Sequence, residues 1–144
     1  FKADVGVEGE VEALFEAIKT TLGSHPQYLV NNAGVLHRSQ PFDELAVQET
    51  YDYVFTANVL GPLLCTQAFV KCLLPEIEAG AAKGGSIVNV SSGSAIIGKP
   101  LIYSMSKGAL NSMMAGLVQD LTPRGIRVNN VAPGMTATEM ITEE

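Results

Sequence analysis

Tyr103 and Lys107 stand four positions apart in the stretch YSMSK (103–107), which follows a loop that contains glycine and proline. On a helix, residues i and i+4 share a face, so the ammonium group of the lysine can approach the phenol oxygen. A phenol has a pKa of about 10 in water, and a nearby cation favours its ionised form. Such a phenol acts as a general acid–base toward an alcohol or a carbonyl. An exposed pair on a helix surface is the other interpretation of these two residues taken alone.

The elements that must position this pair include three predicted strands, each of which ends in small polar residues. The strands are QYLVNNAG (27–34), GGSIVNVSS (84–92) and GIRVNNVAPG (125–134). Their β-branched residues and their Gly, Pro or Ser borders favour strand structure. Asn and Gly also terminate single strands for local reasons. In an open parallel sheet, however, ligands bind at the carboxyl ends of the strands, so three such ends together predict a binding crevice.

Helical periodicity fills the segments between the strands. It predicts helices over 7–23, from about 44 to 74 ahead of Pro75, and over 103–121. Strands that alternate with helices indicate βαβ units and a parallel sheet. The predicted fold class is therefore α/β, a doubly wound parallel sheet within a single domain that spans 1–144.

Charge and composition exclude several classes of partner. The 144 residues carry a net charge of −6, and only nine are Lys or Arg. Since no basic cluster exists to neutralise phosphates, we expect no nucleic-acid partner. No apolar run approaches the roughly 18 residues that span a bilayer, so we expect no membrane partner. Cys65 and Cys72 fall two helical turns apart, too far for a disulfide, and lack metal-ligand spacing. We expect a reduced, cytoplasmic protein without a metal, with organellar targeting left open.

Five motifs occur in one order along the chain. Their order and spacing closely resemble those of the short-chain dehydrogenase/reductase (SDR) family over nearly the whole chain. The resemblance implies an incomplete Rossmann-like fold and an NAD(P)-dependent oxidoreductase that acts on a secondary alcohol or ketone. The motifs are NNAG (31–34), ANVLG (57–61), NVSS (89–92), YSMSK (103–107) and RVNNVAPGMTAT (127–138).

The resemblance assigns catalytic roles to four residues. Tyr103 is the acid–base, and Lys107 favours its phenolate form and hydrogen-bonds the nicotinamide ribose. Ser92 holds the substrate oxygen and stabilises the charge that develops on it. Asn58 anchors a water relay to Lys107. Without the family, Asn58 is as readily a core amide whose hydrogen bonds are satisfied.

The cofactor that the resemblance implies is NAD or NADP. The small residues of NNAG match the turn beneath the ribose and permit close approach of the backbone, and the resemblance implies that Pro133 and Gly134 lie against the nicotinamide. Two of the matching residues also have a structural interpretation, since Asp4 can cap a helix and Thr138 can begin one. The positions that match cofactor contacts of the family are Asp4, Val5, Asn32, Ala33, Gly34, Tyr103, Lys107, Pro133, Gly134 and Thr138.

Two features depart from the family pattern. The loop from Ser92 to Tyr103 is shorter than usual, so Ser91 and Ser94 remain alternative hydroxyls. The glycine-rich TGxxxGxG turn that cradles the pyrophosphate is missing, as is the residue that selects NAD or NADP. We therefore expect a partial domain that is inactive alone, with an exposed apolar edge beside the strand of NNAG.

Three expectations concern the wider function. A non-catalytic subunit that keeps the fold is the alternative function, and a doubly wound domain of different chemistry is a further one. Helices 44–74 and 103–121 match those through which family members oligomerise, so we expect a homo-oligomer. The substrate is a small molecule in a pocket whose apolar wall is formed by residues after Gly134 and by Ile96, Ile97, Leu101 and Ile102.

Overall fold

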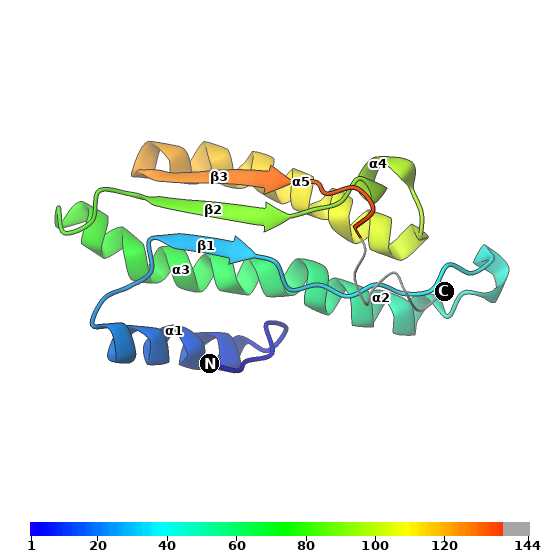
Figure 1. Cartoon of the computed structure of the whole chain (residues 1–144), viewed down its shortest axis with the longest axis horizontal. Helices are drawn as coiled ribbons and strands as arrows, with labels where there is room; N and C mark the ends of the chain where they lie inside the picture. The colour runs from blue at the N-terminus through cyan, green and yellow to red at the C-terminus, as the bar shows by residue number, and fades with distance from the viewer. Residues whose placement is uncertain (137–144) are drawn as a thin grey trace.

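Three parallel strands form one sheet in the order β1-β2-β3 (Figure 1). The paired residues run from Tyr28 with Ser86 on the first ladder and from Gly85 with Ile126 on the second. The computed structural model describes residues 1–136. The predicted α/β class with a parallel sheet is confirmed. The strands are β1 (Tyr28–Asn31), β2 (Gly85–Val90) and β3 (Ile126–Val131).

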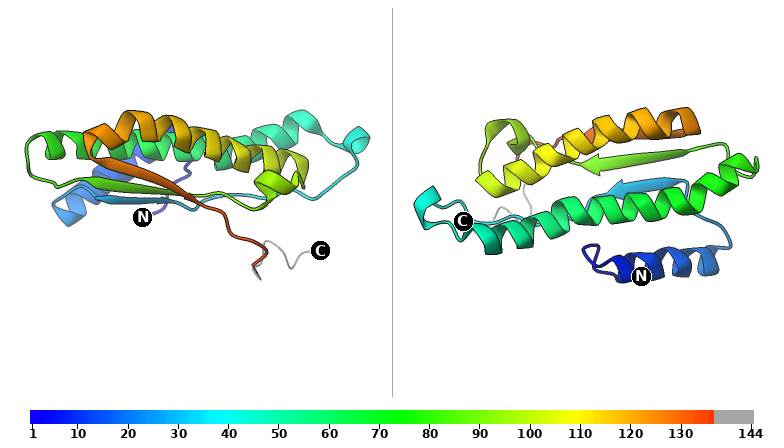
Figure 2. Two further views of the ribbon diagram at one scale, coloured as in Figure 1. Left: turned by 90° about the horizontal axis from the view of Figure 1, so that it is seen from above. Right: turned by 180° about the vertical axis from the view of Figure 1, so that it is seen from behind.

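Helices α3 and α5 lie together on one face of the sheet, and α1 packs beside α3 (Figure 2). Within 1–136, the opposite face carries no helix, so the double winding is incomplete, as the sequence predicts. The helices are α1 (Glu8–Leu22), α2 (Val47–Phe55), the π-helical turn η2 (Thr56–Leu60), α3 (Gly61–Glu78), α4 (Ser94–Ile97) and α5 (Leu101–Leu121), with single 3-10 turns η1 (Phe42–Glu44) and η3 (Thr122–Arg124).

The hydrophobic core fills the space between this helical layer and the sheet. Its largest fully buried side chains come from α3, from two strands and from the end of α5. Removing them from water supplies most of the stabilisation that holds the helices on the sheet. They are Phe69, Leu73, Ile87, Leu121 and Ile126.

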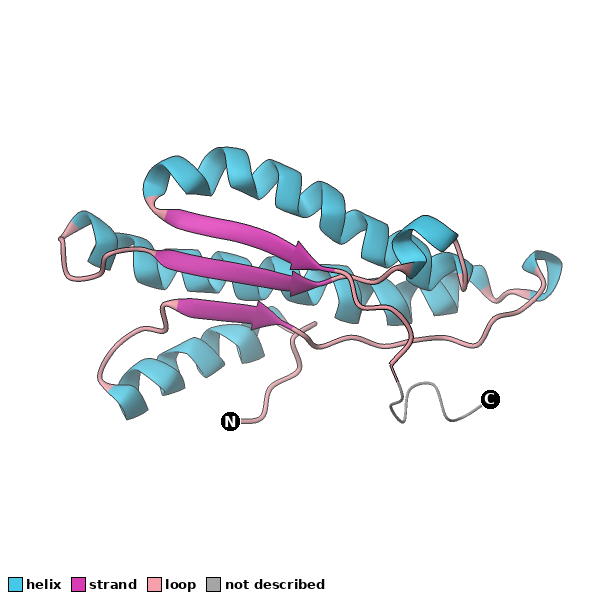
Figure 3. Cartoon of the chain, turned by 45° about the horizontal axis from the view of Figure 1, so that its top comes forward, coloured by secondary structure: helices cyan, strands magenta, loops and turns pink. Residues whose placement is uncertain are grey.

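The outer edge of β1 carries no hydrogen-bonded neighbour among the described strands (Figure 3). Tyr28 is 75% exposed and Val30 is 60% exposed on this strand. An apolar, unpaired edge is a template for a further strand. The exposed edge that the sequence predicts is therefore present.

The predicted helix end before Pro75 is wrong, because α3 continues to Glu78. Proline removes one backbone donor from a helix and crowds the preceding turn. Here Leu74 and Ile77 pack into the core on either side of the proline, and this burial offsets the lost hydrogen bond. The strands, by contrast, are shorter than the predicted segments, since they end at Asn31, Val90 and Val131 and leave the glycine-, serine- and proline-containing residues to the loops.

The prediction that no segment is long and apolar enough to cross a bilayer is also wrong, because one helix has sufficient length and hydropathy. The continuous helix Val47–Glu78 has a mean hydropathy of 1.4 over its most apolar window. That window is 44% buried inside the fold, where its residues cover the sheet. Core helices of proteins without a membrane span have the same character, so the helix alone is weak evidence for a membrane.

Candidate active site

A cavity of about 880 Å³ opens at the carboxyl ends of the three strands. The loops after β1, β2 and β3 form its floor, and the first two turns of α5 form one wall. The predicted crevice is therefore present where the polar strand ends meet. Eight of the residues predicted for the site line it: Asn32, Ala33, Gly34, Ser92, Tyr103, Lys107, Pro133 and Gly134.

Tyr103 and Lys107 face the same cavity from consecutive turns of α5. The Nζ atom of Lys107 lies 5.6 Å from the centroid of the Tyr103 ring. The lysine is only 4% exposed, and burial lowers the pKa of its ammonium group. Nζ donates a hydrogen bond of 2.8 Å to the backbone oxygen of Val90, the last residue of β2. One of three ammonium N–H bonds is used in this way, so two remain for the cavity.

Asn58 lies in the π-helical turn η2 and is fully buried. Its Oδ1 accepts from the backbone N–H of Val35 at 2.7 Å, and its Nδ2 donates to the backbone oxygen of the same residue at 2.9 Å. The second N–H of Nδ2 is donated to Ser106 Oγ at 3.0 Å. Both amide protons are therefore used, and Oδ1 keeps one lone pair for a further partner. π turns inside α-helices occur often at functional sites.

Gly34 brings Asn58 and Lys107 close together. A Cβ atom on Gly34 would lie 3.1 Å from Asn58 Oδ1 and 3.4 Å from Lys107 Nζ. A side chain at this position would therefore push the amide oxygen or the ammonium group aside by a few tenths of an ångström, which glycine avoids.

The three candidate serines all line the cavity, but they differ in their hydrogen bonds. Ser91 is buried, and its Oγ donates to the backbone oxygen of Lys107 at 3.0 Å. Ser92 Oγ accepts from the backbone N–H of Ser94 at 3.1 Å. The hydroxyl proton of Ser92 thus stays available for a ligand, whereas that of Ser91 holds the sheet to α5. This geometry favours Ser92.

The two N-terminal cofactor candidates lie outside this cavity. The carboxylate of Asp4 accepts from the backbone N–H of Gly6 at 2.9 Å in the turn ahead of α1. It does not cap the helix, because the N-cap of α1 is Val7 and carries no side-chain capping bond. Val5 lines a neighbouring cavity of about 240 Å³ beside β1, which shares Asn32 and Ala33 with the first. Thr138, the last cofactor candidate, lies outside the described residues.

A ladder of asparagine side chains, which sequence reasoning missed, crosses the sheet below the cavity. Asn31 Nδ2 donates to Asn89 Oδ1 at 2.8 Å, and Asn89 Nδ2 donates to Asn130 Oδ1 at 3.0 Å. The ladder ends on α3 at Thr66 and on α5 at Asn111. The sequence pattern that could have predicted this ladder is the recurrence of Asn at each strand end. From the sequence alone, we interpret these residues as the lining of a crevice and not as a network across the strands. The network fixes both helices relative to the strand ends.

The space around Gly34 generates a prediction about stability. We expect Gly34→Ala to lower the free energy of unfolding by about 1 to 3 kcal/mol, because the methyl group overpacks a site whose amide is held by three hydrogen bonds. Thermal or urea unfolding of the full-length protein measures the change. Gly108→Ala is the control, because a Cβ there has no atom within 4 Å and alanine favours helix. Equal stability of the two variants would contradict the close approach.

Comparison with known proteins identifies the family of the chain. A family model described as "short chain dehydrogenase" matches residues 1–144. The chain is 38% identical over 145 residues to "Uncharacterized oxidoreductase YgfF" of Escherichia coli, covering 96% of this chain and 56% of that protein.

Two solved structures share the fold. A 3-ketoacyl-(acyl-carrier-protein) reductase from Brucella melitensis complexed with NADH superposes with a TM-score of 0.88 at 30% identity, over 97% of this chain and 57% of that one. A gluconate 5-dehydrogenase from Burkholderia cenocepacia in complex with NADP and tartrate gives a TM-score of 0.84 at 25% identity, over 98% and 54%. The chain spans about half the length of the relatives it matches. It belongs to the short-chain dehydrogenase family.

Proposed function

We propose that this protein is an NAD- or NADP-dependent oxidoreductase that moves a hydride between the cofactor and a secondary alcohol or ketone. The observation that carries the proposal is the shared cavity of Ser92, Tyr103 and Lys107 at the strand ends. Three groups that donate or accept protons converge there, as a carbonyl that becomes an alkoxide requires. Membership of the family and the NADH and NADP of the two similar structures support the cofactor class.

The residues present fit the nicotinamide ring and its ribose, which form one half of such a cofactor. Lys107 retains two N–H bonds for ribose hydroxyls, and Gly34 lines the same cavity. Pro133 and Gly134 lie on the same cavity wall, where a flat ring can rest. The glycine-rich pyrophosphate turn is not among these 144 residues.

In the reduction direction, a nicotinamide held by these residues would supply the hydride that the carbonyl carbon receives. Ser92 Oγ–H donates to the carbonyl oxygen and stabilises its developing negative charge. Tyr103 Oη then gives its proton to that oxygen, which completes the alcohol. The Lys107 ammonium stabilises the resulting phenolate. Oxidation runs through the same residues in reverse.

Asn58 extends the proton path toward solvent in this proposal. Asn58 Oδ1 and Lys107 Nζ both lie close to the backbone of Gly34. A water that bonds to the free lone pair of Oδ1 would connect the amide to the ammonium side of the site.

The cavity wall next to the reacting atoms is apolar, which favours an apolar substituent on the substrate carbon. Leu36, Ile97, Pro100 and Met135 line it. Of the predicted wall, Ile97 lines the cavity, whereas Ile102 is buried in the fold.

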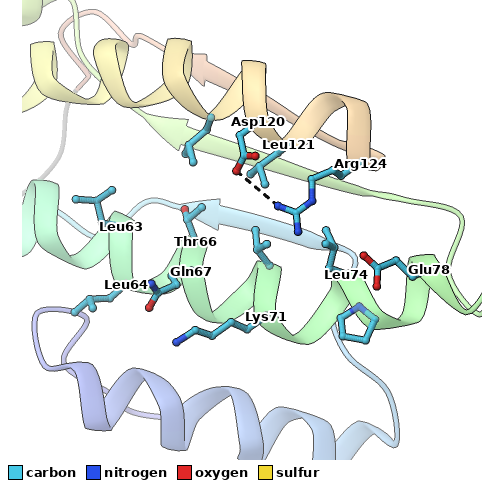
Figure 4. Close-up of a pocket in the computed structure, with 13 residues that line it drawn as sticks. Leu63, Leu64, Thr66, Gln67, Lys71, Leu74, Glu78, Asp120, Leu121 and Arg124 are labelled. Atoms are coloured by element: carbon cyan, nitrogen blue, oxygen red, sulfur yellow. Dashed lines mark ion pairs between the residues drawn. The ribbon is translucent and has the colours of Figure 1, made fainter.

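The same protein is proposed to form a homo-oligomer through the outer faces of α3 and α5. A groove of about 610 Å³ runs between these helices, and Figure 4 shows Leu63, Leu64 and Leu74 of α3 on its wall. Lys71 and Glu78 place opposite charges along the groove, so an antiparallel second copy would pair them around a two-fold axis.

Replacement of the phenol tests the enzymatic role. We expect Tyr103→Phe in the full-length protein to bind NADH or NADPH as tightly as wild type but to lose about 100-fold or more in turnover of an aryl ketone such as acetophenone, because the proton donor is absent. Cofactor fluorescence and absorbance at the reduced nicotinamide band measure the two properties. Tyr53→Phe, an exposed tyrosine on α2, is the control. Unchanged turnover would refute the role, and failure of wild type to bind either cofactor would favour the non-catalytic subunit.

A charge in the groove tests the oligomer. We expect Leu63→Asp to raise the dissociation constant of the assembly at least about tenfold, because it buries a carboxylate at an apolar contact. Light scattering after gel filtration over a dilution series measures the mass. Leu22→Asp, at the exposed end of α1, should leave the mass unchanged. An identical mass profile for Leu63→Asp and wild type would contradict this interface.

A further inference from the structure

Ser106 connects two residues of the site without reaching the cavity itself. It lies on α5 between Tyr103 and Lys107 and is fully buried. Its Oγ accepts from Asn58 Nδ2 at 3.0 Å and donates to the backbone oxygen of Tyr103 at 2.7 Å. A hydroxyl has one proton, so the donation to Tyr103 leaves only acceptor capacity toward Asn58. The two bonds therefore form a directed path from the π turn to the first turn of α5.

The place of Tyr103 in the helix explains why such a tie is needed. α5 begins at Leu101, so Tyr103 lies in the first turn, whose backbone N–H groups have no intrahelical acceptors. Helix ends open more readily than helix interiors. A second hydrogen bond to the Tyr103 carbonyl, anchored on a fully buried amide, restrains this turn. The anchor is itself fixed, because both backbone groups of Val35 bind the Asn58 amide.

We infer that Ser106 is a positioning residue, which holds the Tyr103 turn at a fixed place relative to Asn58 and Lys107. The inference rests on the proposed oxidoreductase activity for its effect on turnover, but not for its effect on geometry. Ser106 binds neither cofactor nor substrate in this account. Loss of its hydroxyl leaves one Asn58 N–H buried without a partner and removes the additional hydrogen bond to the Tyr103 carbonyl.

The neighbouring Ser104 supplies a matched control. It is also buried on α5, one residue after Tyr103, and its Oγ has no hydrogen-bond partner among the described residues. Ser104→Ala removes the same atoms from the same helix turn but breaks no hydrogen bond of the site. A general effect of serine removal on α5 would appear in both variants, whereas a positioning effect would appear only in Ser106→Ala.

The experiment compares Ser106→Ala, Ser104→Ala and Ser106→Thr in the full-length protein. The first readout is NMR of ¹⁵N-labelled Asn side chains and of Tyr rings. We expect one Asn58 amide proton to exchange at least about tenfold faster, and the Tyr103 ring resonances to shift, in Ser106→Ala alone. The second readout is reduction of acetophenone. We expect kcat to fall about tenfold or more while the KM for NADH or NADPH stays within about twofold, since a misplaced acid costs turnover but not binding.

The role of Ser106 can be tested separately from the proposed oxidoreductase activity. Ser106→Thr restores the hydroxyl and should return the Asn58 amide signal and most of kcat. If that methyl group does not fit, the NMR contrast between the two alanine variants still decides. Identical Asn58 and Tyr103 spectra in the two alanine variants would overturn the inference. The inference would also be overturned if Ser106→Ala lost kcat, cofactor affinity and melting temperature to the same degree, because that pattern marks a structural role only. If wild type reduces no ketone, the oxidoreductase proposal fails while the NMR readout still tests Ser106.

Discussion

A nearly buried ammonium group is the constraint on which the site depends. Lys107 is 4% exposed, and taking a charged amine out of water costs several kcal/mol unless nearby groups compensate it. The backbone oxygen at the end of β2 and the face of the Tyr103 ring supply that compensation. Both must arrive at the same place, one from the sheet and one from a helix. The fold must therefore hold β2 and α5 at a fixed distance from each other.

Polar contacts between the elements set that distance. The asparagine ladder joins the strand ends to α3 and α5, while Ser91 joins the end of β2 to the backbone of Lys107. These bonds lie in a buried layer, where hydrogen bonds are stronger and unpaired groups are costly. Above this layer, the strand-end loops are free to carry glycine, serine and proline for ligand contact. The structure thus separates a rigid polar layer from a cavity that opens above it.

Much of this arrangement follows from local sequence patterns, and the rest does not. The β-branched runs locate all three strands, and the residues that end them do line one cavity. Helical spacing places Tyr103 and Lys107 on one face of α5. The helix end predicted from Pro75 is wrong, because burial of Leu74 and Ile77 outweighs the tendency of proline to end a helix. The π turn at Asn58 and the role of Ser106 were not visible, because their partners lie far away in the sequence, 48 residues apart for Asn58 and Ser106. Roles for Ser92 and Asn58 came from family resemblance, since neither residue has a distinctive local pattern.

The most direct test of the account concerns the ammonium group itself. Turnover of acetophenone by Lys107→Ala in the full-length protein is measured with and without added ethylammonium. We expect a loss of about 100-fold or more and a partial, concentration-dependent return of turnover with the small amine, because the site requires a cation beside Tyr103. Wild-type turnover by Lys107→Ala without any amine would contradict it.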